Sequence, residues 1–414
     1  MRQAGGTPTW RFSLVCVIGL QLLTTAGTWW ITDHGEILAV ADRFLTAGRM
    51  DLRDLPPGFA SWTRIAAERH NWETRFLPGS ILSLVPFLAI DRLLGWTELA
   101  QFRVVHLQGH VLVGLSLFFA GLAVFRSTRS HQMATLAVLL SGFSWPVWMI
   151  ARRLGPEPVL MLLVTLFITG GVRTRSACLF ALPWVHPSGL LLGLGLMTVL
   201  AFEKPGTSAW LIPGAGLVGG MMTVALLWNL PTHGNFVAGG YERYAADRFF
   251  ELRNPLVGMA SQLSIIVLST VPVWLFGLAA PRGRIARCIT LALPSLVFFG
   301  TFSNTEVTRR FAPLVAAWVI LLSEGAATQS FARVASLAGM AFGSGVIGLA
   351  MDFVSSVATP WGTFNGPHLL LISLAFVEHQ PALAAALSAL LTALTARGAQ
   401  QALRAMRDED PGPQ

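Results

Sequence analysis

The sequence predicts an all-α polytopic membrane protein with about 11 transmembrane helices and a large first external loop carrying juxtamembrane amphipathic helices. The composition points to this class, because 53% of the 414 residues are hydrophobic, 12% are charged and the mean hydropathy is +0.60. A soluble chain carries about 25% charged residues. Bilayer-length apolar runs also recur along the chain. We therefore treat residues 1–414 as a single integral-membrane domain.

The apolar runs define the predicted spans, since about 17–25 apolar residues cross a bilayer. The long runs are 12–31, 102–125, 132–150, 177–201, 208–228, 258–280, 286–302, 332–350 and 368–396, and shorter runs lie at 158–171 and 311–325. The segment 76–95 contains two prolines and ends in charge. We expect it to lie in, or dip into, the outer leaflet instead of crossing.

Basic clusters orient these spans, because arginine-rich short loops stay inside. The clusters are 126–131, 172–176, 281–287 and 397–407. Together with a basic N-terminus they leave 32–101 and 229–257 as external loops. They also require an odd number of crossings between 177 and 228, where two apolar runs are visible. Either one run is re-entrant, or His186–Pro187 breaks the first into two short helices.

The same features exclude other classes of protein. The net charge of +8 comes from loop residues that set topology, so the expected partners are membrane lipids and no nucleic acid. The three cysteines, Cys16, Cys178 and Cys288, are isolated and form neither a metal-site spacing nor a disulfide framework.

Acidic residues gather in the first external loop. Nine of the 21 acids lie between Asp33 and Glu98, and the apolar runs are nearly free of charge. A transport pathway would instead place ionisable groups in mid-span. The asymmetry favours chemistry or binding at one membrane face.

That loop begins with "TDHGEILAVADRFLTAGRMDL", in which apolar residues from Ile37 onward follow a helical period. The pattern predicts an amphipathic helix lying on the membrane, with Asp33 and Glu36 at its N-terminus. Asp33 either caps this helix or acts chemically. The remaining acids are expected to be solvated or paired with nearby arginines: Asp42, Asp51 and Asp54 with Arg43, Arg49 and Arg53.

Arginines beside the apolar runs at this face suit a phosphate, because a guanidinium group bonds its oxygens in a fork. The candidates are Arg75, Arg103, Arg309 and Arg310. The alternative is that each binds lipid headgroups without selection.

In their order, these features resemble the GT-C class of integral-membrane glycosyltransferases, which includes the protein O-mannosyltransferases and bacterial enzymes that modify lipids and polysaccharides. The matching segments span residues 30–325: "TDHGEILAVADRFLTAGRMDL", "RFLPGSILSLVPFL", Arg103, "RRLGPEP" with Glu157, "WNLPTHGNFVAGGYERY" and "TRRFAPL". The chain departs from the family pattern where Ile37–Leu38 replace an aromatic residue and "LPG" replaces a Pro-Pro element.

The resemblance implies a hexosyl- or pentosyltransferase of the bacterial cytoplasmic (inner) membrane with an outward-facing active site. It would pass a sugar, with inversion, from a polyprenyl-phosphate-linked donor to a hydroxyl of a lipid, glycan or protein acceptor. The implied roles are Asp33 as general base, Glu36 as a second acid that orients the acceptor or binds a metal, Glu157 as a supporting acid, Arg309 and Arg310 with Arg75 or Arg103 on the phosphate, and Tyr241 on sugar or lipid. No cofactor is required by the pattern; a divalent cation, if used, would bind Asp33 and Glu36.

Two alternatives remain open at this stage. A carrier or flippase of lipid-linked glycans would bind the same phosphate without a base. A membrane acyltransferase would need a histidine base, for which the candidates are His34, His70, His110 and His186. Of these, His110 and His186 lie inside apolar runs, where we expect hydrogen-bonded structural histidines.

Overall fold

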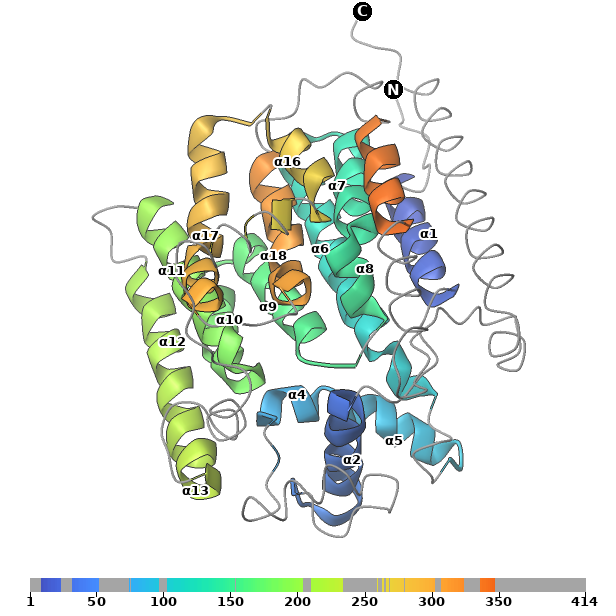
Figure 1. Ribbon diagram of the computed structural model, residues 1–414, viewed down its shortest axis with the longest axis vertical. Coiled ribbons are helices and arrows are strands. Elements are labelled where there is room, and N and C mark those ends of the chain that lie inside the picture. Colours follow the sequence, from blue (N-terminus) through green and yellow to red (C-terminus); the bar gives the residue numbers. More distant parts are fainter. Residues whose placement is uncertain are drawn as a thin grey trace, which may run out of the picture.

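The computed structural model is a helical bundle with a smaller layer of helices at one end (Figure 1). It describes residues 9–23, 32–51, 74, 76–96, 103–152, 154–203, 210–233, 259, 263, 266–267, 269–278, 280–301, 307–323 and 336–346. Within these ranges the first four residues of the helix that begins at Thr32 are described by their backbone alone.

The bundle is formed by α1 (Thr9–Leu23), α6 (Gln108–Thr128), α7 (His131–Phe143), α8 (Trp145–Ala151), α9 (Glu157–Thr169), α10 (Val172–Val185), α11 (Pro187–Glu203), α12 (Leu211–Val224), α16 (Val271–Gly277), α17 (Arg282–Thr301) and α18 (Val307–Ser323). Helix α18 lies in the core, since every residue from Phe311 to Leu322 is buried. Its first turn carries Arg309 and Arg310. In Figure 1 this N-terminal end of α18 is the lower end of the helix, toward the smaller layer.

Several predicted spans are helical, although the predicted count of about 11 is not confirmed. Among the described residues, Val104–Thr128 and Leu211–Thr232 are long and apolar enough to cross a membrane as single helices. The predicted span 132–150 is a broken pair, α7 and α8, bent by 68° at Ser144. Other apolar helices are shorter, and the predicted span 368–396 lies outside the described residues.

The region 177–228 contains the break at His186 that the sequence left as one of two alternatives. Ser176 on α10 donates to the carbonyl of Ile212, and Trp184 donates to Thr223 Oγ1 at 3.0 Å, so α10 and α12 run parallel. Helix α11, which joins them, must run in the opposite direction. Gly216 and Gly220 lie directly against the α10 backbone and permit this close approach. The run therefore makes two helices instead of one, as the second of the two alternatives expected.

The layer at the lower end consists of α2 (Thr32–Ala47), α4 (Pro78–Leu82), α5 (Val85–Leu93) and the short η3 (Val104–Leu107) (Figure 1). The apolar face of α2 is buried against α4, α5 and Leu154. The prediction that α2 lies on the membrane through this face is wrong, because protein covers the face. A helical period identifies an apolar face, but it does not show whether lipid or protein packs against that face.

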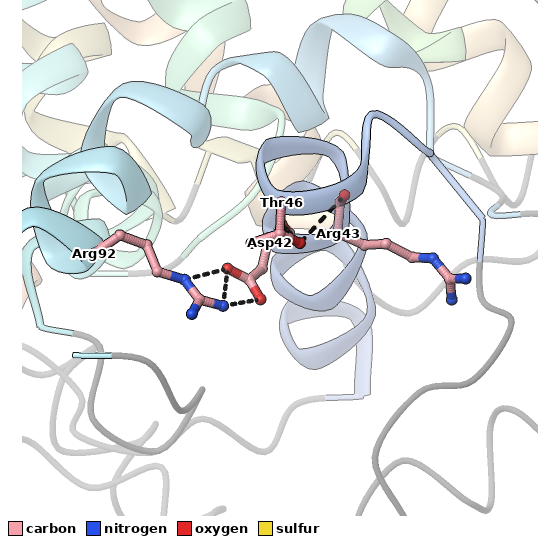
Figure 2. Close-up of polar contacts among 4 residues, drawn as sticks. All are labelled: Asp42, Arg43, Thr46 and Arg92. Carbon is pink, nitrogen blue, oxygen red and sulfur yellow. Dashed lines mark hydrogen bonds and ion pairs between the residues drawn. The ribbon is translucent and has the colours of Figure 1, made fainter. Parts of the chain in front are cut away.

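Two carboxylates fix the layer. Asp91, fully buried on α5, accepts hydrogen bonds from the backbone N–H groups of Arg103, Val104 and Val105 at 2.8–2.9 Å. Asp42 on α2 binds Arg92 on α5 through both carboxylate oxygens, at 2.6 and 2.7 Å from Nη2 (Figure 2). These contacts fix α2 and the start of α6 against α5.

The sequence assigned Asp42 a local arginine partner, and this is a correction: the partner is Arg92, 50 residues away. Arg43 points away from Asp42 (Figure 2) and forms an ion pair with Asp51 at 3.2 Å, as expected for that acid. Successive residues on a helix point about 100° apart, so Asp42 and Arg43 face different neighbours. Asp54 and Arg53 lie outside the described residues.

Candidate functional site

The first turns of α2 carry two of the predicted acids, Asp33 and Glu36. Asp33 lies in the first turn of α2, and its side chain is outside the described atoms. Glu36 is buried, and its Oε1 accepts a hydrogen bond from Thr74 Oγ1 at 3.0 Å. The Thr74 hydroxyl in turn accepts the backbone N–H of Phe76. Glu36 thus ties α2 to the segment that leads into α4.

Glu157 and Arg309 form a buried ion pair. The distance between Glu157 Oε1 and Arg309 Nε is 2.7 Å, and the two residues are 4% and 7% exposed. Glu157 is the first residue of α9, where the helix dipole favours a carboxylate. Gly155 leaves room for this acid, because a Cβ built there would lie 2.8 Å from Glu157 Oε2. The structure therefore brings two of the predicted site residues into direct contact.

Arg310, the next residue along α18, has neutral partners. Its Nη1 lies 3.0 Å from His186 Nε2, and its guanidinium carbon lies 5.9 Å from the centre of the Phe299 ring. No carboxylate in the described part of the chain forms an ion pair with Arg310, and its buried Nε has no hydrogen-bond partner there. Among the described residues, therefore, no acid balances the charge of Arg310, whereas Glu157 balances the charge of Arg309.

Three helix N-termini meet around these side chains. The Glu157–Arg309 contact joins the starts of α9 and α18, and the His186–Arg310 contact joins the starts of α11 and α18. Each helix N-terminus carries a partial positive charge of about half a unit. Two arginines at such a point raise the positive potential further, and one carboxylate balances only part of it. An anion is the chemical group that this arrangement stabilises.

The remaining predicted site residues are not tested by these contacts. Arg75 and Tyr241 lie outside the described residues. Arg103 is exposed, and its backbone N–H donates to Asp91. Within the described ranges no group of three or more His, Cys, Asp or Glu residues could hold a metal ion, but the proposed carboxylate pair includes the Asp33 side chain, which is outside them.

Two contacts of the site were not foreseen from the sequence. His186 was expected to be a hydrogen-bonded structural histidine, and it is buried and hydrogen-bonded, but its contact with the predicted phosphate-binding Arg310 was not foreseen. Gly155 was not singled out, although it stands two residues before Glu157 and makes space for it. The His-Pro break was visible in the sequence and signalled the position of His186, but its partner on α18 is 124 residues away.

Comparison with known proteins bears on the fold. No protein-family model matches the sequence, and no curated protein matches it. Among solved structures, the chain is similar to ArnT from Cupriavidus metallidurans bound to undecaprenyl phosphate, with a TM-score of 0.53, 14% identity, and coverage of 95% of this chain and 73% of ArnT. The same protein in the apo state gives a TM-score of 0.52 and 13% identity, covering 95% and 72%. The chain therefore has an ArnT-like, GT-C-like fold, and this fold and its apolar helices indicate an integral membrane protein.

Proposed function

We propose that this protein is a membrane glycosyltransferase that transfers a sugar from a polyprenyl-phosphate-linked donor to a hydroxyl acceptor. The observation that carries the proposal is the pair of arginines at the start of α18, one balanced by Glu157 and one not, in a fold similar to that of ArnT bound to undecaprenyl phosphate. A lipid phosphate supplies the anion that the positive end of α18 stabilises.

The proposed transfer step uses Asp33 as the base and Arg310 as the phosphate-binding residue. Asp33 accepts the proton of the acceptor hydroxyl as its oxygen bonds to the anomeric carbon. The bond between that carbon and the phosphate oxygen breaks, and the lipid phosphate leaves with the electron pair. Arg310 stabilises the negative charge that develops on the phosphate. Attack on the face opposite the leaving group inverts the anomeric centre.

The fixed layer supports this assignment of Asp33. The Asp42–Arg92 and Glu36–Thr74 contacts hold α2 in one position, and Leu154, three residues before Glu157, packs in the same apolar cluster as α2. A base must be held within about 3 Å of its proton, so a rigid helix suits the role. The proposed location is the bacterial cytoplasmic membrane, with this end of the bundle facing outward.

The test is an assay of lipid-phosphate release. Full-length protein in proteoliposomes is given undecaprenyl-phosphate-linked hexoses and pentoses with a cell-envelope fraction as acceptor, and released undecaprenyl phosphate is measured by mass spectrometry. Asp33→Asn is expected to lower the rate at least about 100-fold, because it removes the general base. Asp51→Asn, the same change at an ion pair with Arg43 farther along the chain, serves as the matched control.

Two outcomes would contradict the proposal. Normal turnover by a folded Asp33→Asn protein would remove Asp33 from the role of base. Movement of a lipid-linked glycan across the bilayer without release of undecaprenyl phosphate would favour the carrier or flippase alternative, which needs the arginines but no base.

A further inference from the structure

His186 occupies the break between α10 and α11, at the end of the bundle that holds Arg310. Its backbone is extended, with φ −162° and ψ 150°, and Pro187 starts the next helix. A proline cannot continue α10, and the residue before it avoids the helical region. The break therefore fixes the histidine backbone, and the side chain is buried at 6% exposure.

The contacts of the ring have a definite polarity. An arginine can only donate, so Nε2 of His186 must accept from Arg310 Nη1 at 3.0 Å. A neutral imidazole then carries its proton on Nδ1, where Ser188 Oγ lies 2.7 Å away and accepts it. The Ser188 backbone N–H, 3.1 Å from Nδ1, fits the opposite tautomer, so Arg310 decides which form the ring takes. The result is a chain of contacts from Ser188 through His186 to Arg310.

The same chain of contacts orients the guanidinium of Arg310. Its guanidinium carbon lies over the Phe299 ring, and His186 binds one of its terminal nitrogens. Neither partner is an acid, so both hold the group without neutralising it. Arginine has a flexible stem, and an orientation fixed before binding lowers the entropy cost of binding.

We infer that His186 is a positioning residue: it holds the guanidinium of Arg310 in the orientation that receives the phosphate of the lipid donor. The inference rests on the proposed function, because it needs Arg310 to bind that phosphate. His186 itself transfers no proton and forms no bond to the sugar. It acts by presenting the acceptor nitrogen Nε2 to Arg310, while Ser188 Oγ accepts the proton that this tautomer carries on Nδ1.

The experiment measures binding of undecaprenyl phosphate to the full-length protein in lipid nanodiscs by titration, together with kcat and KM in the release assay. His186→Phe keeps a ring but loses the acceptor, and should weaken binding about tenfold. His186→Gln offers an amide oxygen to Arg310, and should stay within about threefold of the wild type. His131→Phe, at an exposed histidine at the other end of the bundle, controls for the substitution.

A double-mutant cycle separates positioning from general destabilisation. In an Arg310→Gln background His186→Phe should cause no further loss of binding, because the partner through which it acts is gone. The inference is overturned if His186→Phe binds undecaprenyl phosphate as the wild type does, or if it weakens binding equally in both backgrounds. If His186→Phe does not fold, His186→Gln still tests the inference. Loss of undecaprenyl phosphate binding by a folded His186→Gln protein would contradict the role of His186.

Release and binding of undecaprenyl phosphate by the wild-type protein test the proposed function separately from the role of His186. If it releases no undecaprenyl phosphate from any donor and does not bind that lipid, the glycosyltransferase proposal fails. If it is active and the His186 variants behave like the wild type, only the role of His186 fails.

Discussion

The two ends of the bundle hold arginine in different ways. At the end that faces α2, α4 and α5, Arg309 is buried and bound to Glu157, and Arg310 is partly buried against His186. At the opposite end, Arg126 in the last turn of α6, Arg129 directly after α6 and Arg282 at the start of α17 are exposed. These three arginines are solvent-accessible, and Arg287, in the second turn of α17, forms an ion pair of 3.1 Å with Glu203 that is less buried than the Glu157–Arg309 pair.

The difference follows from the cost of burying charge. A buried charge must be paired and hydrogen-bonded, so its position is fixed by particular partners. Water solvates an exposed arginine at almost any surface position. Such a residue needs no particular partner, and in a short loop it helps to orient the neighbouring spans. The contacts of an arginine therefore distinguish a site residue from one that only orients the spans, and its position in the sequence does so less well.

The largest effect is expected at the buried ion pair. Glu157→Gln leaves the Arg309 charge buried without its carboxylate, and should lower the free energy of unfolding by about 3–5 kcal/mol. Denaturant unfolding in detergent micelles measures the loss. The Glu157→Gln/Arg309→Gln double variant should regain part of it, because no lone charge is then left. A single variant as stable as the wild type would mean that the pair is not a structural contact.

A smaller loss is expected at Gly155. Gly155→Ala adds a Cβ at a φ of +158°, which L residues rarely adopt, and places it 2.8 Å from Glu157 Oε2. The backbone and the carboxylate must then shift, at a cost of about 1–3 kcal/mol. Gly283→Ala is the matched control at the opposite end, since nothing lies within 4 Å of the added Cβ. The change in the free energy of unfolding should be negative for Gly155→Ala and positive for Gly283→Ala, because alanine at an unhindered helical position is favourable. Equal behaviour would show that the space beside Glu157 is not limiting.

The Asp42–Arg92 contact should matter less. Arg92→Gln removes a partly exposed bidentate pair and should cost about 1 kcal/mol. Because the pair joins α2 to α5, hydrogen exchange should rise in these two helices before it rises in α18. Arg43→Gln, which removes the neighbouring pair with Asp51, is the comparison. Uniform exchange across the molecule would contradict a local role.

The smallest effect is expected at the exposed end. Arg126→Gln should change the free energy of unfolding by less than about 0.5 kcal/mol, because the side chain is exposed and surface changes of this kind are usually small. Release of undecaprenyl phosphate should also be unchanged. A loss of activity comparable to that of Arg310→Gln would remove the distinction between the two ends.

Part of this arrangement was predictable from the sequence. The apolar runs placed most helices of the bundle, and the His186–Pro187 pair marked a possible break in the second half. The apolar face of α2 was also readable from its period, but its cover was not, because lipid and protein select the same residues. Asp42 shows the same limit, since its partner comes from a helix that is distant along the chain.

Composition and periodicity by themselves determined the membrane class and most of the helical segments, because these follow from burial of apolar length and from local helical geometry. The gathering of acids between Asp33 and Glu98 was also read directly from the sequence. Only the tertiary structure separated Arg309 from Arg310. The two are adjacent and chemically identical, yet α18 turns them about 100° apart, so one meets Glu157 and the other meets His186. Contacts between helices decide charge balance, and those contacts are not local in the sequence.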